Sequence, residues 1–583
     1  MSTPATIRFV TRRPPPQPGA VCVDLHAQPQ PGTGIETLTA DELLARWSGD
    51  AVEWFAGWLG QLNARHAALD WWAYSSTSKN FLSSALGART LQLLALRNLA
   101  RSGRYRLIVV LGATPGQMRS GARLLQPEFT VTLPSTLGLG LRNLAAHALA
   151  IGRVIYQAVR IRGAFRFGTV PPETRRDVIL FTYLDGEFSA GWDRYFGDLA
   201  DLIRQQQPEL RTACVAYVYT PYRQRLDEML ARATEPYLPL YGFLDNGELL
   251  RALGRSIAAT FGLNKYSAGM DVEAAAMASL LEEALIEDVS RRGYLHNLLV
   301  HHATAAMVRT LSPSRVIYPY ENKSLEKALL LGARAAGGVR LVGYQHTSIT
   351  PRHIGLRFEA GETATTPLPD RIVTVGSITR DYLEESGNYP AGRLVAGCAL
   401  RQAWTAPLPS RPLAAGHPRI LLALSSSIRE LVSAVEFMRE VKTRLPGVEI
   451  GVRPHLNFPL TILSPELRDW VRTHATDFSG SLLQDNLAWA DVTAYVSSTV
   501  ALESLMLGRP VIYLAIDPDN PDPLLGNPRF RWTAGTTDEF VAALDALAAL
   551  DTAQRENERD AALDYVRSYL TPKSPQTVAQ FLQ

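Results

Sequence analysis

Short apolar runs alternate with segments of helical periodicity along most of the chain. Each run is dominated by Val, Ile, Leu and aromatic residues and ends at a glycine or at polar residues, which is typical of a buried strand followed by a turn. In the first part of the chain the clearest runs are 106–112, 177–184, 212–219, 314–320 and 340–345. Strands that alternate with helices through short loops predict α/β architecture with mostly parallel sheets.

The same alternation resumes near residue 370. The later apolar runs are 371–376, 418–424, 448–452, 491–496 and 511–515. At 583 residues the chain exceeds what one core usually supports, so we expect two Rossmann-like, doubly wound domains that face a cleft, with an N-terminal helical extension. The predicted divisions are a leader at 1–35 that is poorly structured or a first strand, an N-terminal α/β domain with helical insertions at 36–365, and a C-terminal Rossmann-like domain at 366–583.

Composition narrows the functional classes. Apolar residues make up 46% and charged residues 20% of the chain, as in ordinary globular proteins. A net charge of +3 argues against general nucleic-acid binding. The three cysteines are far apart, and no signal core or apolar stretch of about 20 residues is present, so we expect a cytoplasmic protein that does not span a membrane.

Positive charge gathers in residues 141–166. This segment holds Arg142, Arg153, Arg160, Arg162 and Arg166, with no Asp or Glu, among Leu, Ile, Val, Tyr and Phe at helical spacing. Such a helix can lie on an anionic membrane surface. It can equally be a solvated helix that packs on its own domain, and the pattern leaves both interpretations open.

A turn rich in small hydroxyl residues predicts an anion site. Residues 497–499 read Ser-Ser-Thr between a strand and a helix, where backbone N–H groups and the helix dipole converge on a phosphate. The alternative is that these residues only cap the helix. The candidate nucleotide and phosphate ligands at this and neighbouring turns are Ser425, Ser426, Arg453, His455, Ser497, Ser498, Thr499 and Glu503.

These turns carry a resemblance to a known group of enzymes. Arg453-Pro454-His455 and Ser497-Ser498-Thr499 resemble the phosphate-binding and nucleotide-binding turns of GT-B glycosyltransferases that use CMP-activated sugars, the bacterial Kdo transferases and sialyltransferases. Those families usually read His-Pro where this chain has His455-Leu456, which weakens the inference of the nucleotide.

Motifs in the first half extend the resemblance to surface-carbohydrate biosynthesis proteins, some related to retaining Kdo transferases. They are Trp71-Trp72 with Ser78-Lys79-Asn80, Tyr320-Glu321-Asn322 with Glu326-Lys327, and Gly343-Tyr344-Gln345-His346. The similarity covers about residues 70–515. It implies a GT-B fold, retention of the anomeric configuration and catalysis without a metal.

Sugar transfer needs a carboxylate, as a base for the acceptor hydroxyl or as a nucleophile. Glu321 and Asp185 are the candidates, and His346 is expected to carry a proton or to donate to the sugar carboxylate. The alternatives are a helix-start carboxylate for Glu321 and a turn residue for Asp185. We expect Lys79, Asn80, Asn322 and Gln345 to bind acceptor or donor-sugar oxygens.

No metal or other cofactor is expected. Asp517-Pro518-Asp519 lies in a Pro-rich loop, and His301 and His302, as neighbours on a helix, face different directions.

The resulting hypothesis is a glycosyltransferase that moves a Kdo-like or sialic-acid-like sugar from CMP to a surface polysaccharide, lipopolysaccharide or lipid-linked glycan. We expect the N-terminal domain to hold the acceptor and the catalytic carboxylate and the C-terminal domain to hold the nucleotide sugar. We expect the protein to be cytoplasmic and peripheral at the inner face of the plasma membrane. The alternatives are another GT-B enzyme, such as an epimerase or a polyol-phosphate transferase, and a non-catalytic component that binds sugar nucleotides or glycans.

Overall fold

The structure is a computed structural model of the chain. It describes residues 5–11, 19–26, 36–81, 83–168, 175–184, 193–218, 237–291, 293–402, 404, 406–413, 417–425, 427–455, 458–517 and 521–583. Two of the predicted site residues, Asp185 and Ser426, lie outside the described residues.

The chain begins with a small parallel sheet. Its order is β3-β2-β4-β1-β5. The strands are β1 (Thr6–Val10), β2 (Ala20–Asp24), β3 (Glu36–Thr39), β4 (Leu107–Leu111) and β5 (Thr130–Thr132). The helices on this side are α1 (Ala40–Trp47), α2 (Ala51–Arg65), α4 (Leu86–Arg101) and α5 (Pro115–Leu125), whereas the short helix α3 (Leu69–Trp72) packs against α13 (Ser324–Ala336). The N-terminal extension, predicted to be helical, therefore has a sheet of its own, and the predicted leader supplies two of its strands.

A seven-stranded parallel sheet forms the middle of the molecule. Its strands are β6 (Val178–Leu184), β7 (Thr212–Val218), β8 (Tyr237–Pro239), β9 (Arg315–Pro319), β10 (Arg340–Gln345), β11 (Arg371–Thr374) and β12 (Leu394–Ala396). The order is β12-β11-β10-β9-β6-β7-β8, so the winding direction reverses between β6 and β9. All residues of β6 are buried, which explains its uninterrupted apolar run. The longer helices of this part are α7 (Leu199–Gln206), α9 (Asn246–Ala258), α11 (Ala278–Arg291), α12 (Tyr294–Leu311), α13 (Ser324–Ala336) and α14 (Ser377–Ser386).

A six-stranded parallel sheet forms the third part. Its strands are β13 (Arg419–Ala423), β14 (Glu449–Arg453), β15 (Thr476–Asp477), β16 (Val492–Tyr495), β17 (Val511–Leu514) and β18 (Arg531–Ala534). The order is β15-β14-β13-β16-β17-β18, which is the Rossmann order with its reversal between β13 and β16. Its helices are α15 (Ile428–Arg444), α16 (Pro465–His474), α17 (Leu483–Trp489), α18 (Val500–Met506) and α19 (Thr537–Ala548). The predicted fold class, α/β with two Rossmann-like doubly wound domains, is confirmed.

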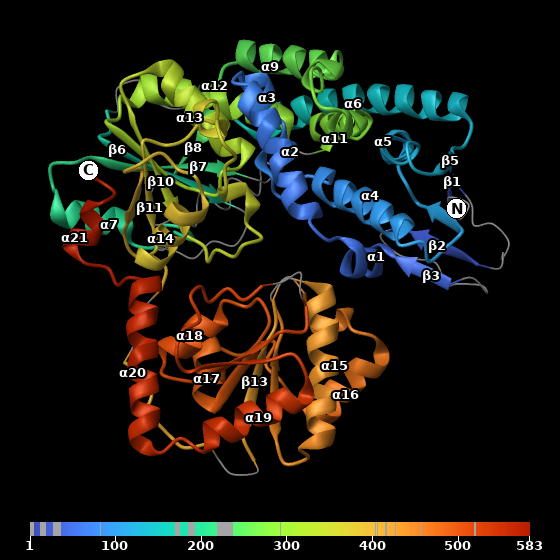
Figure 1. The fold of residues 1–583 in the computed structure, drawn as a ribbon. Coiled ribbons are helices and arrows are strands. Elements are labelled where there is room, and N and C mark those ends of the chain that lie inside the picture. The colour runs from blue at the N-terminus through green and yellow to red at the C-terminus, as the bar shows by residue number, and fades with distance from the viewer. Residues whose placement is uncertain are drawn as a thin grey trace.

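The chain changes from the second sheet to the third between Ala396 and Arg419, later than the predicted division at 365/366. Both β11 and β12 extend the second sheet, because β11 pairs in parallel with β10 and with β12. The C-terminal end also returns to this part of the molecule. Helix α20 (Thr552–Tyr569) runs from the third sheet toward the second, and α21 (Pro575–Ala579) packs beside α7 (Figure 1).

The longest helix is α6 (Thr136–Ala164), which lies along an edge of the molecule and packs against α11 and α9 (Figure 1). In the part of the chain that the structure describes, no helix is long and apolar enough to cross a bilayer. The remaining short elements are α10 (Val272–Ala276) and the 3-10 helices η1 (Ser75–Ser78), η2 (Leu240–Phe243), η3 (Leu263–Tyr266), η4 (Ile354–Leu356), η5 (Glu362–Ala364) and η6 (Leu460–Ile462).

Candidate functional site

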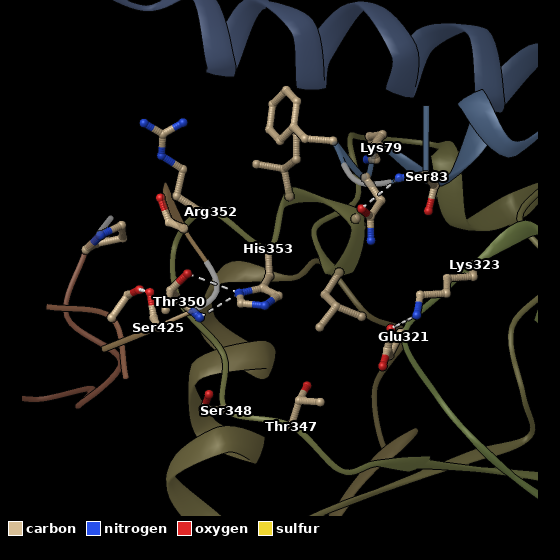
Figure 2. A pocket seen from close by; sticks show the side chains of 18 residues that line it. Lys79, Ser83, Glu321, Lys323, Thr347, Ser348, Thr350, Arg352, His353 and Ser425 are labelled. Carbon is tan, nitrogen blue, oxygen red and sulfur yellow. Dashed lines mark hydrogen bonds and ion pairs between the residues drawn. The ribbon is translucent and has the colours of Figure 1, made fainter. Parts of the chain in front are cut away.

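A cavity of about 870 Å³ opens between the second and third sheets. Glu321 follows β9, whereas Ser425 and Ser497 follow β13 and β16, and all three residues line the cavity. Figure 2 shows Glu321 and Ser425 on opposite walls. Ligands of doubly wound sheets bind beyond the carboxyl ends of the strands where the winding direction reverses. The cavity therefore lies at that position for both sheets.

The Glu321 carboxylate faces the cavity beside Lys323, to which its Oε2 is ion-paired, and the Glu321 side chain is 27% exposed. Burial by itself raises the pKa of Glu321, but the charge of Lys323 and its hydrogen bond more than offset burial, so that the pKa lies below its usual value. Glu321 is thus ionised at neutral pH, as a base or a nucleophile requires.

Glu326 lies behind Glu321 and is buried. Its Oε2 accepts a hydrogen bond of 2.9 Å from the backbone N–H of Glu321, just before α13. Burial, followed by the charge of Glu321, raises the pKa of Glu326 to about 8. The helix-start role that was the alternative for Glu321 is therefore filled by Glu326, and the two carboxyl groups hold different protonation states at neutral pH.

His346 lies beside Glu321 in the protein interior. Its Nε2 lies 3.4 Å from Glu321 Oε1, and its ring packs against Tyr195 with 4.9 Å between the ring centroids. Burial lowers the pKa of His346 to about 3, although Glu321 opposes the shift. His346 is thus neutral, and it is not among the cavity-lining residues.

A second histidine, His353, lines the cavity instead. Its Nδ1 accepts a hydrogen bond of 2.9 Å from the backbone N–H of Thr350, which leaves the proton of the neutral ring on Nε2. The surrounding walls lower the pKa of His353 by desolvation, while the ring remains exposed to the cavity. Sequence reasoning missed this residue, although the polar run after β10 continues as far as His353.

Lys79 is bound within the protein. Its Nζ lies 2.7 Å from Glu362 Oε2, and both side chains are 1% exposed. The Lys79 Nζ also donates to the backbone carbonyl of Arg357. Lys79 and Asn80 both line the cavity, but the ammonium group that was predicted to bind sugar oxygens already has two protein acceptors.

Asn322 and Gln345, the other predicted sugar ligands, are buried and are not among the cavity-lining residues. Asn322 Nδ2 donates to the carbonyl of Gly355 at 2.7 Å, and Gln345 Nε2 donates to the carbonyl of Thr347. Their contacts hold the loop after β10, which forms one wall of the cavity.

The serine turns meet at the opposite wall. Ser497 Oγ donates its one proton to Glu430 Oε2 at 2.6 Å and lies 2.9 Å from Ser425 Oγ, and the Ser497 N–H lies 3.4 Å from Glu430 Oε1. Glu430, in the first turn of α15, is fully buried. A protein carboxylate therefore already accepts the donors predicted for the phosphate. Ser425 lines the cavity beside Ser497, where its hydroxyl can meet a ligand.

The remaining predicted phosphate ligands that the structure describes are not among the cavity-lining residues. Strand β13 separates the turns of Arg453 and Ser497. Arg453 Nη1 is bound to Ser481 O at 2.9 Å and to Asn486 Oδ1 at 2.6 Å. Thr499 makes no side-chain capping bond to α18, so the helix-cap alternative is not supported for it. The other residues of this set are His455, Ser498 and Glu503.

Within the described ranges, no three His, Cys, Asp or Glu side chains are grouped as metal ligands. The His301 and His302 rings lie edge to face at 5.2 Å, and burial lowers the pKa of each. The metal-independence of the protein stays an expectation.

Comparisons with known proteins show only weak structural similarity. No protein-family model matches the chain, and no curated protein does either. Among solved structures, the chain resembles HepE of Anabaena in complex with UDP and glucose at 9% identity and a TM-score of 0.40, over 70% of this chain and 98% of the other. It resembles a glycosyltransferase of Rickettsia africae at 10% identity and a TM-score of 0.39, over 70% and 99%. It resembles UDP-GlcNAc 2-epimerase of Neisseria meningitidis at 11% identity and a TM-score of 0.37, over 68% and 100%. Similarities of this size assign no activity.

Proposed function

We propose that this protein is a glycosyltransferase that moves a Kdo-like or sialic-acid-like sugar from a CMP-activated donor to a surface polysaccharide or lipopolysaccharide acceptor. One observation supports the transferase: an ionised carboxylate, Glu321, stands across a cavity from the serine turns, where both sheets reverse their winding. The cavity volume of about 870 Å³ is within the range of about 300–1,000 Å³ that is usual for small-molecule sites. The identity of the sugar and of CMP rests on the motif resemblance.

The chemistry assigned to Glu321 follows from its protonation state. As a nucleophile, the carboxylate attacks the anomeric carbon while the bond from that carbon to the phosphate oxygen breaks, and the electron pair leaves with CMP. The acceptor hydroxyl then attacks the anomeric carbon, the bond to Glu321 breaks and the acceptor proton passes to water, so that the two displacements together retain the anomeric configuration. As a base, Glu321 instead takes the acceptor proton in a single displacement that inverts the configuration. The resemblance to retaining transferases favours the first route.

The cavity also carries groups suited to an anionic donor. Arg352 and Lys323 bring positive charge, and His353 offers an Nε2–H on the same side of the cavity. Ser425 lines the wall opposite Glu321. Such donors stabilise the negative charge that develops on the departing phosphate, most strongly where water is excluded.

Nucleotide release tests this proposal. The full-length protein is incubated with CMP-Kdo, CMP-sialic acid, UDP- and GDP-sugars and a CDP-polyol, and the released nucleotide is quantified by chromatography. We expect CMP release, reduced by about 10²–10⁴-fold in Glu321→Gln, because a positioned base or nucleophile contributes about that much. The matched control is Glu466→Gln, whose side chain is 81% exposed on α16 and which should keep full activity.

Each other outcome overturns a defined part of the proposal. If none of the CMP-sugars is turned over, the donor assignment fails, and turnover of the CDP-polyol would indicate a polyol-phosphate transferase. If a nucleotide sugar binds but is not consumed, and Glu321→Gln changes nothing, the protein is a binding component.

Ser425 offers a separate test of the rear wall. Ser425→Ala removes a hydroxyl that we expect to bond the phosphate, and a hydrogen bond to a charged group contributes about 1.5–3 kcal/mol. The dissociation constant of the nucleotide should therefore rise by about 10- to 100-fold. Ser267→Ala, outside the cavity lining, is the control. An unchanged constant in Ser425→Ala would remove Ser425 from the site.

A further inference from the structure

Helix α6 carries an unusual share of the exposed apolar surface. Among the described residues, half of the large apolar side chains that are exposed to solvent belong to this helix. They are Leu141 (60% exposed), Leu144 (68%), Leu149 (50%), Ile155 (44%), Tyr156 (58%) and Val159 (66%). Soluble proteins usually cover a continuous apolar surface of this kind, or use it for binding.

These side chains form a strip opposite the buried face of the helix. Ala150, Val154 and Ile161 are buried on the face that packs into the protein. Leu141 and Val159 are about five full turns apart and share one angular position, which lies on the other side of the helix from Ile161. The helix therefore has two apolar faces, of which only one is covered by the protein.

Arginines border the exposed strip. Arg142 and Arg160 are also about five turns apart, and Arg153 lies within about 20° of them, so that all three follow one flank of the strip. The Arg160 guanidinium lies over the Tyr156 ring at 5.4 Å. Two further arginines, Arg162 and Arg166, lie toward the C-terminal end of the helix and just beyond it.

This positive charge is local. No Asp, Glu or Lys occurs between residues 129 and 172, and the five arginines there exceed the net charge of +3 of the whole chain. The rest of the chain therefore has a small net negative charge, so the net positive charge of the molecule is supplied by this segment.

We propose that α6 docks the protein on an anionic lipid bilayer, with its axis in the plane of the membrane. The strip enters the boundary between headgroups and acyl chains, and the flanking arginines bind lipid phosphates. A bilayer suits this helix because the apolar residues form one continuous row and the arginines run along its length without a carboxylate among them. The inference goes beyond the proposed transferase and does not depend on it.

Co-sedimentation with vesicles tests the inference without any sugar substrate. The full-length protein is mixed with vesicles of phosphatidylcholine, with or without phosphatidylglycerol, and the bound fraction gives a partition coefficient. We expect binding that requires phosphatidylglycerol and weakens with added salt. Arg142→Gln/Arg153→Gln/Arg160→Gln should reduce the coefficient by about 100-fold, since each basic residue near an anionic surface contributes about fivefold.

The apolar strip has its own variant and control. Leu141→Gln/Leu144→Gln/Val159→Gln should reduce partitioning by at least about tenfold, because these side chains no longer enter the interface. Two controls lie outside α6: Leu482, which is 72% exposed, and Arg472, whose side chain is 75% exposed. Leu482→Gln and Arg472→Gln should both leave the partition coefficient unchanged. Circular dichroism should show that all variants are folded.

Two results would overturn the inference. In the first, the wild-type protein does not sediment with phosphatidylglycerol vesicles, or the folded α6 variants sediment as much as the wild type does. In the second, light scattering shows a wild-type dimer that the apolar variant converts to a monomer with unchanged vesicle binding, so that the strip is a contact between copies of the chain.

Discussion

Replacing Lys79 tests whether this lysine holds the fold or binds the ligand. Its ammonium lies 2.7 Å from the Glu362 carboxylate, and neither side chain is more than 1% exposed. Glu362 also accepts from Asn63 Nδ2 at 2.8 Å and from the backbone N–H of Glu359 at 2.9 Å. Lys79→Met would leave this carboxylate buried without its partner. Breaking a buried ion pair on one side costs about 3–5 kcal/mol of unfolding free energy.

A second lysine, Lys327, determines how much unfolding free energy Lys79→Met should lose within that range. Burial lowers the pKa of Lys327 to about 7, the charge of Glu362 opposes this shift, and the charge of Lys79 adds to it. Without Lys79, Lys327 holds its proton more firmly and partly neutralises Glu362. We therefore expect a loss near 3 kcal/mol, the lower end of the range, while Lys327 is protonated, and a larger loss at higher pH.

Urea denaturation followed by fluorescence measures the loss as a shift of the first unfolding transition. The matched control is Lys323→Gln, since Lys323 is also paired with a glutamate beside the cavity but is 41% exposed. An exposed pair contributes at most about 1 kcal/mol, so this variant should unfold nearly as the wild type does. The reasoning is refuted if Lys79→Met costs under about 1 kcal/mol and instead raises KM, because Lys79 would then bind substrate.

Three further variants test the site and its support. In Lys323→Gln the loss of positive charge lets burial raise the pKa of Glu321, so the acid limb of the kcat/KM profile should move to higher pH, and an unmoved limb would contradict the ion pair. The raised pKa of Glu326, about 8 against an ordinary 4.5, means that its contribution to stability is complete below pH 4.5 and is lost as the pH rises through 8. Glu326→Gln should abolish this pH-dependent loss, so the difference between the urea midpoints of the variant and the wild type should change as the pH rises through 8. A difference that stays constant with pH would contradict the raised pKa of Glu326. Gly332→Ala should lower Tm, because the new Cβ would lie 2.2 Å from the carbonyl oxygen of His301, and a higher Tm would show that α12 and α13 can move apart.

The fold was largely accessible from the sequence because buried parallel strands leave uninterrupted apolar runs. The run at 177–184 is such a case, since β6 is covered on both faces. The first sheet was missed because β1 alternates, with Ile7 and Phe9 buried and Arg8 exposed, and so resembles a minor surface strand. The sheet boundary was misplaced because β11 and β12 look like the first strands of a new domain.

The site was only partly accessible, and sequence separation explains why. Glu321 was found because it marks a local change from strand to helix. Glu430 was missed because it is 67 residues away from Ser497, whose donors it accepts, and resembles an ordinary first-turn glutamate. The partner of Lys79 is 283 residues away. Short motifs located the loops, but they did not reveal which donors the protein itself already occupies.

Strand order supplies what the motifs lack. Where a doubly wound sheet reverses its direction, the loops after the two central strands diverge to opposite faces and leave a crevice between them. In the second sheet these loops follow β6 and β9, and in the third they follow β13 and β16. Glu321, Ser425 and Ser497 follow three of these four strands, and Asp185, which lies outside the described residues, is the next residue in the sequence after β6. Asp185→Asn is therefore the natural companion of Glu321→Gln in the nucleotide-release assay. If only one of the two variants loses activity, that residue is the catalytic carboxylate.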